Sequence, residues 1–242
     1  MKSIPLFIGL ILLAGCAEEP PSPSTTTETT RLEPPREAPG SVTDDAGRTS
    51  GPRVVFVGTS LTAGYGLARP TTMSWVGQVS ALAADEGTPI EAVNAGVSGD
   101  TSAGGLRRIA AHLTVPTDAV VLELGANDGL RGLPVAALAR NLASAIDTIR
   151  AHAPDAAIVV ARMEAPPNLG AAYVESFSAV FDSLEARGDV RVTPFLLEGV
   201  AGIPALNQRD GIHPLPEGHR RLAETVWPTL REALTHASAG GG

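Results

Sequence analysis

Short apolar runs alternate with amphipathic stretches along most of the chain. The runs, which are rich in β-branched residues, cover 53–57, 90–93, 119–124, 156–161 and 190–192. A helical pattern follows each run, over 72–84, 101–113, 134–151, 172–187 and 216–233. Proline or glycine stands at most of the boundaries. Runs that are apolar on both faces and separated by helices predict an α/β fold with a five-stranded parallel sheet and helices on both sides.

The N-terminus carries a different pattern. After Met1 and Lys2, a nearly uninterrupted apolar run covers residues 4–15 and ends at Cys16. A run of this length rises only ~18 Å as a helix, which is too short for a ~30 Å hydrocarbon core. A charged start, a short apolar stretch and small residues at its end predict a signal peptide over residues 1–15.

The end of this stretch resembles a bacterial lipobox. Residues 13–16 read Leu-Ala-Gly-Cys, and in lipoproteins such a cysteine becomes the lipidated first residue of the mature chain. An ordinary secretory signal with an incidental cysteine is the alternative. The resemblance implies a lipid anchor at Cys16 in the bacterial cell envelope. Ala17 further implies the periplasmic side of the outer membrane, if the cell is Gram-negative.

The segment after the cysteine is polar and rich in turn-forming residues. Half of the 34 residues from 17 to 50 are Pro, Ser or Thr. Such a segment buries too little apolar surface to offset the entropy of ordering it. We therefore expect residues 16–50 to be a lipidated, disordered tether, residues 51–236 to be one folded domain, and residues 237–242 to be a flexible tail.

Composition and charge exclude several classes of function. The net charge of the chain is −8, so no basic excess is available to neutralise the phosphates of a nucleic acid. Cys16 is the only cysteine, which leaves the predicted domain without a disulfide, a thiolate nucleophile or a cysteine zinc site. A hydrophobic content of 43% suffices for a core.

The predicted sheet directs attention to the loops that follow its strands, because ligands bind at the carboxyl ends of the strands in such folds. Residues 58–64, after the first strand, read Gly-Thr-Ser-Leu-Thr-Ala-Gly. A serine on such a tight turn can present its hydroxyl to a cleft. Ser60 is therefore a candidate nucleophile, and its alternative role is an ordinary helix N-cap.

Two further loops carry candidate donors to an anion. Gly99, after the second strand, precedes a predicted helix, where a backbone N–H can point at negative charge. Asn127, after the third strand, has an amide that can donate to a developing oxyanion. The alternatives are a plain turn glycine and a turn asparagine in a left-handed conformation.

Asp210 and His213 stand on a loop before the last predicted helix. A carboxylate at this spacing can hold the imidazole Nδ1–H, which leaves Nε2 to take a proton from a serine. One alternative is a solvent-exposed pair. Another is a metal site made of His213 and His219, for which the sequence offers no third ligand at a suitable spacing. We expect neither a metal nor a cofactor.

These signals occur in a fixed order on one edge of a single predicted sheet, and together they resemble the SGNH (GDSL-type) hydrolase superfamily. Residues 98–102 (Ser-Gly-Asp-Thr-Ser) and 123–132 (Glu-Leu-Gly-Ala-Asn-Asp-Gly-Leu-Arg-Gly) are similar to motifs of its thioesterase I/protease I/lysophospholipase subgroup, which includes envelope arylesterases. The resemblance covers about residues 53–232. It implies a flavodoxin-like, three-layer α/β/α sandwich.

The resemblance also implies a role for each candidate. Ser60 would be the nucleophile, His213 its general base, and Asp210 the residue that orients the histidine. The backbone N–H groups of Ser60 and Gly99 and the side chain of Asn127 would form the oxyanion hole. The expected protein is a monomeric, metal-free serine esterase that forms an acyl-enzyme with carboxylic esters, lysophospholipids or acyl thioesters.

Some residues depart from the family pattern or leave their role open. The family usually has aspartate before the nucleophile, and this chain has Thr59, whose hydroxyl can replace part of the aspartate's hydrogen bonding. We expect Glu123, on an apolar strand, to make a structural hydrogen bond or ion pair. Arg107 and Arg108 are expected on a solvated helix face.

Two other functions are compatible with the sequence. The same superfamily includes carbohydrate O-deacetylases, which need an open polar cleft, and a non-catalytic envelope binding lipoprotein could share the fold. An acyl groove is favoured by four leucines near the candidate loops, namely Leu61, Leu67, Leu130 and Leu133, although burial in the core explains most leucines equally well. Residues 163–170 lie where the family shapes its acyl pocket, but they differ from its motifs and so do not indicate the specificity.

Overall fold

A computed structural model of the chain describes residues 51–239. Its centre is one parallel sheet in the order β2-β1-β3-β4-β5. The strands are β1 (Arg53–Gly58), β2 (Glu91–Gly96), β3 (Ala119–Glu123), β4 (Ala157–Arg162) and β5 (Arg191–Phe195). The predicted parallel sheet of five strands is confirmed, and its order is the flavodoxin-like one.

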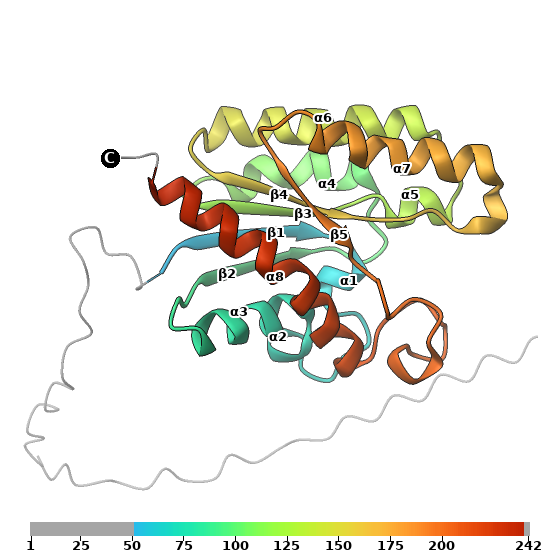
Figure 1. Cartoon of the computed structure of the whole chain (residues 1–242), viewed down its shortest axis with the longest axis horizontal. Helices are drawn as coiled ribbons and strands as arrows, with labels where there is room; N and C mark the ends of the chain where they lie inside the picture. The colour runs from blue at the N-terminus through green and yellow to red at the C-terminus, as the bar shows by residue number, and fades with distance from the viewer. Residues whose placement is uncertain (1–50, 240–242) are drawn as a thin grey trace, which may run out of the picture. The chain divides into compact units, whose positions relative to one another are not determined.

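Helices cover both faces of the sheet (Figure 1). α3 (Trp75–Asp85) and α8 (Pro216–Ala239) pack together on one face, and α4 (Ser102–Arg108), α6 (Val135–His152) and α7 (Ala171–Glu185) pack on the other. The short elements are α1 (Ser60–Ala63), α2 (Pro70–Met73), α5 (Ala126–Leu130) and the 3-10 turns η1 (Ile109–His112), η2 (Pro167–Leu169) and η3 (Pro204–Leu206). The predicted three-layer α/β/α sandwich is therefore correct.

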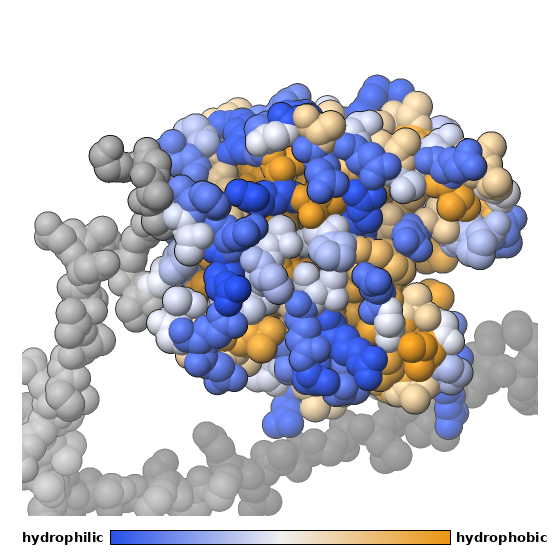
Figure 2. All heavy atoms as spheres, viewed as in Figure 1, coloured by the Kyte–Doolittle hydropathy of each residue, from blue (hydrophilic) through white to orange (hydrophobic). Residues whose placement is uncertain are grey.

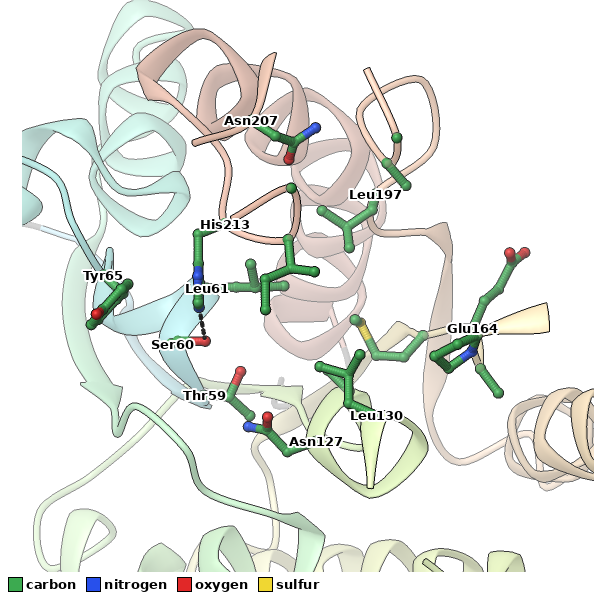
Figure 3. A pocket seen from close by; sticks show the side chains of 18 of the residues that line it. Thr59, Ser60, Leu61, Tyr65, Asn127, Leu130, Glu164, Leu197, Asn207 and His213 are labelled. Carbon is green, nitrogen blue, oxygen red and sulfur yellow. Dashed lines mark hydrogen bonds between the residues drawn. The ribbon is translucent and has the colours of Figure 1, made fainter. Parts of the chain in front are cut away.

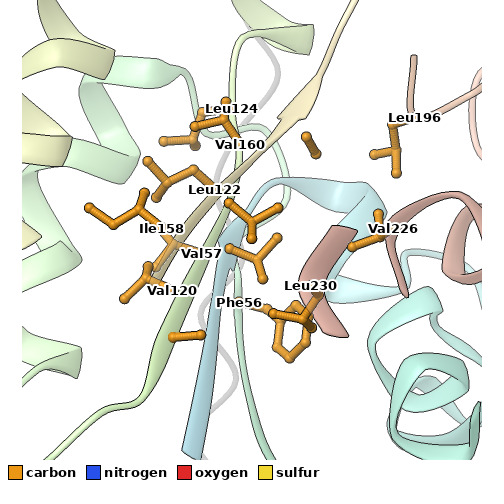
Figure 4. Packing of buried hydrophobic residues seen from close by; sticks show 14 of the residues in the cluster. Phe56, Val57, Val120, Leu122, Leu124, Ile158, Val160, Leu196, Val226 and Leu230 are labelled. Atoms are coloured by element: carbon orange, nitrogen blue, oxygen red, sulfur yellow. The ribbon is translucent and has the colours of Figure 1, made fainter. Parts of the chain in front are cut away.

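The core lies between these layers because the central strands are apolar on both faces. All five residues of β3 are buried, and so are five of the six residues of β1. Figure 4 shows side chains of β1, β3 and β4 packed against one another and against α8, including Val57, Leu122, Val160 and Leu230. Helix α6 buries one stripe at helical spacing, formed by Leu138, Leu142, Ala145, Ile146 and Ile149.

The structure differs from the predicted helices at three places. The helix predicted over 72–84 is interrupted at Ser74, which ends α2 and accepts the N–H of Gly77 as the N-cap of α3, at 3.4 Å. The helix predicted over 101–113 ends at Arg108 and continues as a 3-10 turn. α8 runs to Ala239, so it includes the first residues of the segment predicted as a flexible tail.

The predicted signal peptide, the lipidated Cys16 and the tether lie outside the described residues. Within residues 51–239, no helix combines the length and the hydrophobicity that a membrane span requires. On the face seen in Figure 2, hydrophilic residues cover most of the surface, and a hydrophobic area lies at the right, toward the carboxyl ends of the strands.

Candidate active site

Ser60 begins a helix directly behind the first strand. β1 ends at Gly58, and only Thr59 separates it from α1. The chain can turn sharply after one helical turn because Gly64, in a left-handed conformation with φ +71°, ends α1. Ser60 therefore stands at the carboxyl edge of the sheet, where its hydroxyl lines a pocket.

The structure brings Ser60 to His213, 153 residues later in the chain. The Oγ of Ser60 lies 3.0 Å from Nε2 of His213, as the dashed line in Figure 3 marks. The Nδ1 atom of His213 lies 2.7 Å from Oδ2 of Asp210. With the Nδ1 proton donated to this carboxylate, Nε2 is the acceptor for the serine hydroxyl. The three side chains that the sequence predicts to act together are thus joined by two consecutive hydrogen bonds, from Ser60 to His213 and from His213 to Asp210.

Asp210 is held as a carboxylate. Its second oxygen accepts the backbone N–H groups of Ile212 and His213, both at 3.1 Å. The hydrogen bond from the His213 side chain, followed by these two N–H groups, lowers the pKa of Asp210 to about 2. Asp210 is therefore ionised at neutral pH and can orient the imidazole.

The loop that carries Asp210 and His213 is closed on itself. Asn207 and Pro214 form an antiparallel bridge at its base, and the N–H of Gln208 donates to the carbonyl of His213 at 2.7 Å. The Gln208 side chain also donates to the carbonyl of Tyr65 at 2.8 Å. The Tyr65 ring also contacts the His213 ring, with 4.6 Å between the ring centroids. The hydrogen bond and the ring contact together hold the loop beside the Ser60 helix.

Gly99 and Asn127 line the same pocket as Ser60. Gly99 has φ +82°, which glycine adopts without strain, and its carbonyl accepts the guanidinium of Arg131 at 2.8 Å. The Asn127 Nδ2 donates one proton to the carbonyl of Asp100 at 2.8 Å. The second proton of this amide remains for a ligand in the pocket.

Buried polar contacts tie these segments together. Asp128, which is 3% exposed, accepts the N–H of Ser102 at 2.7 Å and its hydroxyl at 2.6 Å. The amide of Asn141 donates to the same hydroxyl at 2.8 Å. The loop after β2 is therefore fixed to α5, which carries Asn127.

The prediction that Arg108 lies on a solvated face is wrong, whereas Arg107 is exposed as predicted. The Nε of Arg108 donates to the Asp100 carboxylate at 2.7 Å, and its Nη atoms donate to the carbonyls of Gly58, at 2.7 Å, and of Ala95. The ends of β1 and β2 present these carbonyls toward α4, and the sequence around Arg108 does not reveal them. Arg108 thus joins the loops that carry Ser60 and Gly99.

The pocket beside Ser60 measures about 520 Å³ and is mainly apolar. Leu61 and Leu130 line it, as do residues of the 163–170 segment. Leu67 and Leu133 do not line it. The sequence did not mark several further lining residues, namely Tyr65, Phe195, Leu197, Asn207 and Ile212. No local pattern marks them, because strand ends and loops far apart in sequence meet only in the fold (Figure 3).

His219 is not placed as a metal ligand. It is buried, and its Nδ1 accepts the backbone N–H of Trp75 at 3.1 Å. Burial, together with the nearby His213, lowers the pKa of His219 to about 4. Among residues 51–239 no group of three or more metal-binding side chains comes together.

Comparisons with known proteins agree with this architecture. Residues 56–221 match the model of the GDSL-like Lipase/Acylhydrolase family. The chain is 44% identical to Esterase TesA of Pseudomonas aeruginosa, over 75% of this chain and 89% of that protein. It is 35% identical to the Arylesterase of Vibrio mimicus, over 75% of this chain and 90% of that protein.

A third relative, Thioesterase 1/protease 1/lysophospholipase L1 of Escherichia coli K12, is 33% identical over 76% of this chain and 86% of its own length. The crystal structure of a TesA superimposes with a TM-score of 0.70 at 43% identity, over 75% of this chain and 99% of that one. The match of the family model and the extent of these similarities show that the chain belongs to the GDSL-like lipase/acylhydrolase family.

Proposed function

We propose that the protein is a serine esterase that hydrolyses carboxylic acyl esters through an acyl-enzyme. The observation that carries this proposal is the hydrogen-bonded series Ser60–His213–Asp210 at the edge of an apolar pocket. A hydroxyl bonded to an imidazole, itself bonded to a carboxylate, is the arrangement that activates serine as a nucleophile. The names of the relatives, which include esterase, arylesterase and lysophospholipase, support the same class of reaction.

The residues suggest the following steps. The Oγ of Ser60 attacks the ester carbonyl while its proton passes to Nε2 of His213. The carbonyl oxygen becomes an oxyanion that accepts the N–H groups of Ser60 and Gly99 and the free amide proton of Asn127. As the tetrahedral intermediate collapses, His213 gives its proton to the leaving alcohol or thiol. Water, deprotonated by His213, then attacks the acyl-enzyme; the bond to the Ser60 Oγ breaks, His213 returns the proton to this oxygen, and the acid is released.

The pocket favours an acyl chain as the substrate group. Met163, Ala165, Phe195, Leu197 and Ile212 give it apolar walls, and burying an alkyl chain against them contributes about 0.8 kcal/mol per methylene. A carbohydrate would need polar partners on these walls, so carbohydrate deacetylation is not favoured. We therefore propose aryl esters, lysophospholipids or acyl thioesters of short to medium chain length as substrates.

The test is the Ser60→Ala variant together with labelling by a fluorophosphonate, which reacts with activated serines. The wild-type protein is expected to be labelled at Ser60 and to hydrolyse p-nitrophenyl esters, with a rate that depends on acyl length. Ser60→Ala should lose both properties while its thermal unfolding stays the same. Labelling of another residue, or hydrolysis that survives in Ser60→Ala, would exclude Ser60 as the nucleophile.

We further propose that a lipid on Cys16 anchors the protein in the cell envelope. The lipobox-like residues 13–16 support this proposal, because in lipoproteins such a cysteine becomes the lipidated first residue of the mature chain, and buried lipid chains hold a protein at a membrane. Cys16→Ser in the full chain should move the protein from the membrane fraction to soluble or unprocessed forms. Membrane retention of a correctly cleaved Cys16→Ser protein would contradict the proposal.

A further inference from the structure

Glu123 is a buried carboxylate directly beneath the Ser60 turn. It is the last residue of β3, and its exposed fraction is 0%. Its Oε2 accepts the backbone N–H groups of Thr59, at 2.8 Å, and Thr62, at 3.3 Å. The Thr62 hydroxyl donates to the same oxygen at 2.8 Å, and the Thr59 hydroxyl donates to the carboxylate at 3.0 Å. Four donors from one turn thus converge on one side chain.

These contacts suit the ionised form of Glu123. Two of the partners are N–H groups, which can only donate, and the two hydroxyls are able to donate, whereas a carboxylate is an acceptor only. Burial raises the pKa of the Glu123 carboxyl, and the hydrogen bonds from Thr59 and Thr62 offset part of that rise. In the described part of the chain no cation pairs with it. A buried carboxylate without a cation stabilises a fold no better than an apolar residue of similar size. We therefore look for the role of Glu123 in the turn that it holds in place.

The four donors surround Ser60 in the sequence. Thr59 precedes Ser60, and Thr62 lies two residues after it. Thr59 is the N-cap of α1, but its side chain does not cap the helix and donates to Glu123 instead. The N–H of Thr62, which an N-cap side chain would otherwise satisfy, also goes to Glu123. The Ser60 N–H is not among these donors, so it is left for the oxyanion.

The turn has little freedom to move away from Glu123. A Cβ on Gly58 would clash with the Thr62 side chain and lie 2.7 Å from the Glu123 Oε2, so only glycine leaves room for the hydrogen bond between Thr62 and the carboxylate. The carbonyl of Gly58 accepts Arg108 at 2.7 Å, and the carbonyl of Thr62 accepts the amide of Asn94 at 2.7 Å. The Ser60 turn is therefore held from β2, β3 and α4 at once.

We propose that Glu123 is a positioning residue for Ser60, acting through the hydroxyl and N–H groups of Thr59 and Thr62. This inference rests on the proposed function, because it assigns to Glu123 the placement of the nucleophile and of one oxyanion donor. A small displacement of a reacting group lowers the rate steeply, which makes such placement effective in catalysis.

The proposal also explains the threonine at position 59. The family usually has an aspartate there, which would place a second carboxylate against Glu123. Two carboxylates in contact cannot both stay ionised, so such a pair has to hold a proton. Thr59 supplies a hydroxyl donor to the carboxylate and removes that requirement.

The test removes one donor hydroxyl at a time. In Thr59→Val, kcat for a p-nitrophenyl ester and the rate of fluorophosphonate labelling at Ser60 are both expected to fall roughly tenfold, with little change in KM. Thr59→Ser, which keeps the hydroxyl, should restore most of both rates. If Thr59→Val does not fold, Thr62→Val replaces it, with the same expected result.

The matched control is Thr193→Val. Thr193 is also buried, and its hydroxyl donates to the carbonyl of Pro194 at 2.7 Å in β5. This control should lose a similar amount of thermal stability to Thr59→Val but keep its kcat and labelling rate. Equal losses of kcat in Thr59→Val and Thr193→Val, or a loss confined to KM, would overturn the positioning role.

The labelling experiment separates the two proposals. If the wild-type protein is not labelled at all, the proposed serine chemistry fails. If the wild-type protein is labelled and Thr59→Val is labelled equally fast, the chemistry stands and the role of Glu123 fails. Glu123→Gln adds a further check, since its amide group would place donors against the four existing donors. It should slow labelling more than Thr59→Val does.

Discussion

The two halves of the candidate site are built in different ways. The half that carries Ser60, Gly99 and Asn127 lies at the ends of β1, β2 and β3 and rests on two carboxylates, Glu123 and Asp128, which are 0% and 3% exposed. The half that carries Asp210 and His213 is a single loop after β5, and these two side chains are 40% and 17% exposed.

The contacts that fix each half also differ in range. Thr59 and Glu123 are 64 residues apart in sequence, and Ser102 and Asp128 are 26 apart. In the loop that carries Asp210 and the general base His213, here called the base loop, Asp210 is held by N–H groups two and three residues away. The nucleophile half thus depends on tertiary structure, whereas the base loop depends mainly on its own hydrogen bonds. Substitutions that remove these long-range contacts of the first half should therefore affect stability and rate together, and substitutions in the second half should affect mainly the rate.

The largest expected effect in this comparison belongs to Asp210→Asn. The amide no longer favours the imidazole tautomer that accepts the serine proton, so kcat should fall roughly 10⁴-fold with little change in thermal stability. The pKa of Asp210 is lowered to about 2, so the side chain is ionised at every pH above the ordinary pKa of a carboxyl group. The contribution of the carboxylate to holding His213 is lost only as pH falls toward about 2. Protonation of Asp210 itself therefore does not limit the wild-type rate from mildly acidic to alkaline pH.

The exposed Asp155→Asn is the control for this substitution, and it should behave as the wild type in the pH profile of kcat/KM and in calorimetry. A large drop in the unfolding temperature of Asp210→Asn would contradict the view that the base loop contributes little to stability.

Asn127→Ala tests the nucleophile half. The side chain donates to the substrate only when negative charge develops, so kcat should fall roughly 10²–10³-fold while KM changes little. The variant also loses the bond to Asp100, so its unfolding temperature should fall, unlike that of Asp210→Asn. Steady-state kinetics and thermal unfolding check both points, with the exposed Asn168→Ala as control. A raised KM at constant kcat would make Asn127 a ground-state binding residue instead.

A smaller effect is expected from Gln208→Ala, which loosens the connection between the two halves. Its amide reaches the carbonyl of Tyr65 at 2.8 Å and that of Pro214 at 3.2 Å. Without it the base loop should place His213 less accurately, which lowers kcat by less than about tenfold and leaves the unfolding temperature nearly unchanged. The half-buried Gln78, whose amide donates to the carbonyl of Thr72 at 2.8 Å, offers the matched control Gln78→Ala. Equal kinetics in the two variants would show that Tyr65 and the base loop hold their places independently.

The smallest effect on catalysis is expected from His219→Gln, which changes the dependence of stability on pH. His219 is buried and neutral, with its pKa lowered to about 4. Its contribution to stability is present above the ordinary imidazole value of ~6.5 and is lost as pH falls toward about 4, which corresponds to about 3 kcal/mol over that range. Chemical denaturation from neutral to acidic pH should show a flatter profile for the variant. An unchanged slope would mean that another group governs the acid sensitivity.

Much of the fold and of the site follows from local features of the sequence. Five apolar runs separated by helical patterns predict the parallel sheet, since strands that are apolar on both faces must be covered on both. Parallel strands share one carboxyl edge, so Ser60, Gly99 and Asn127 could be placed near each other from their loops alone. Asp210 and His213 could be paired because they are only three positions apart.

The tertiary structure decided the contacts between distant segments. Arg108 binds the ends of β1 and β2 although its helix pattern predicts a solvated face, and Phe195 and Ile212 line the pocket although no pattern marks them. Glu123 could be recognised from sequence only as a polar residue on an apolar strand. Its partners Thr59 and Thr62 depend on the register of β1 against β3, which pairs Gly58 with Glu123. Periodicity and turn residues act over a few positions, so they determine the elements and their loops. Which side chains meet depends on strand register and on packing between segments that are distant in the sequence, and only the folded chain specifies these.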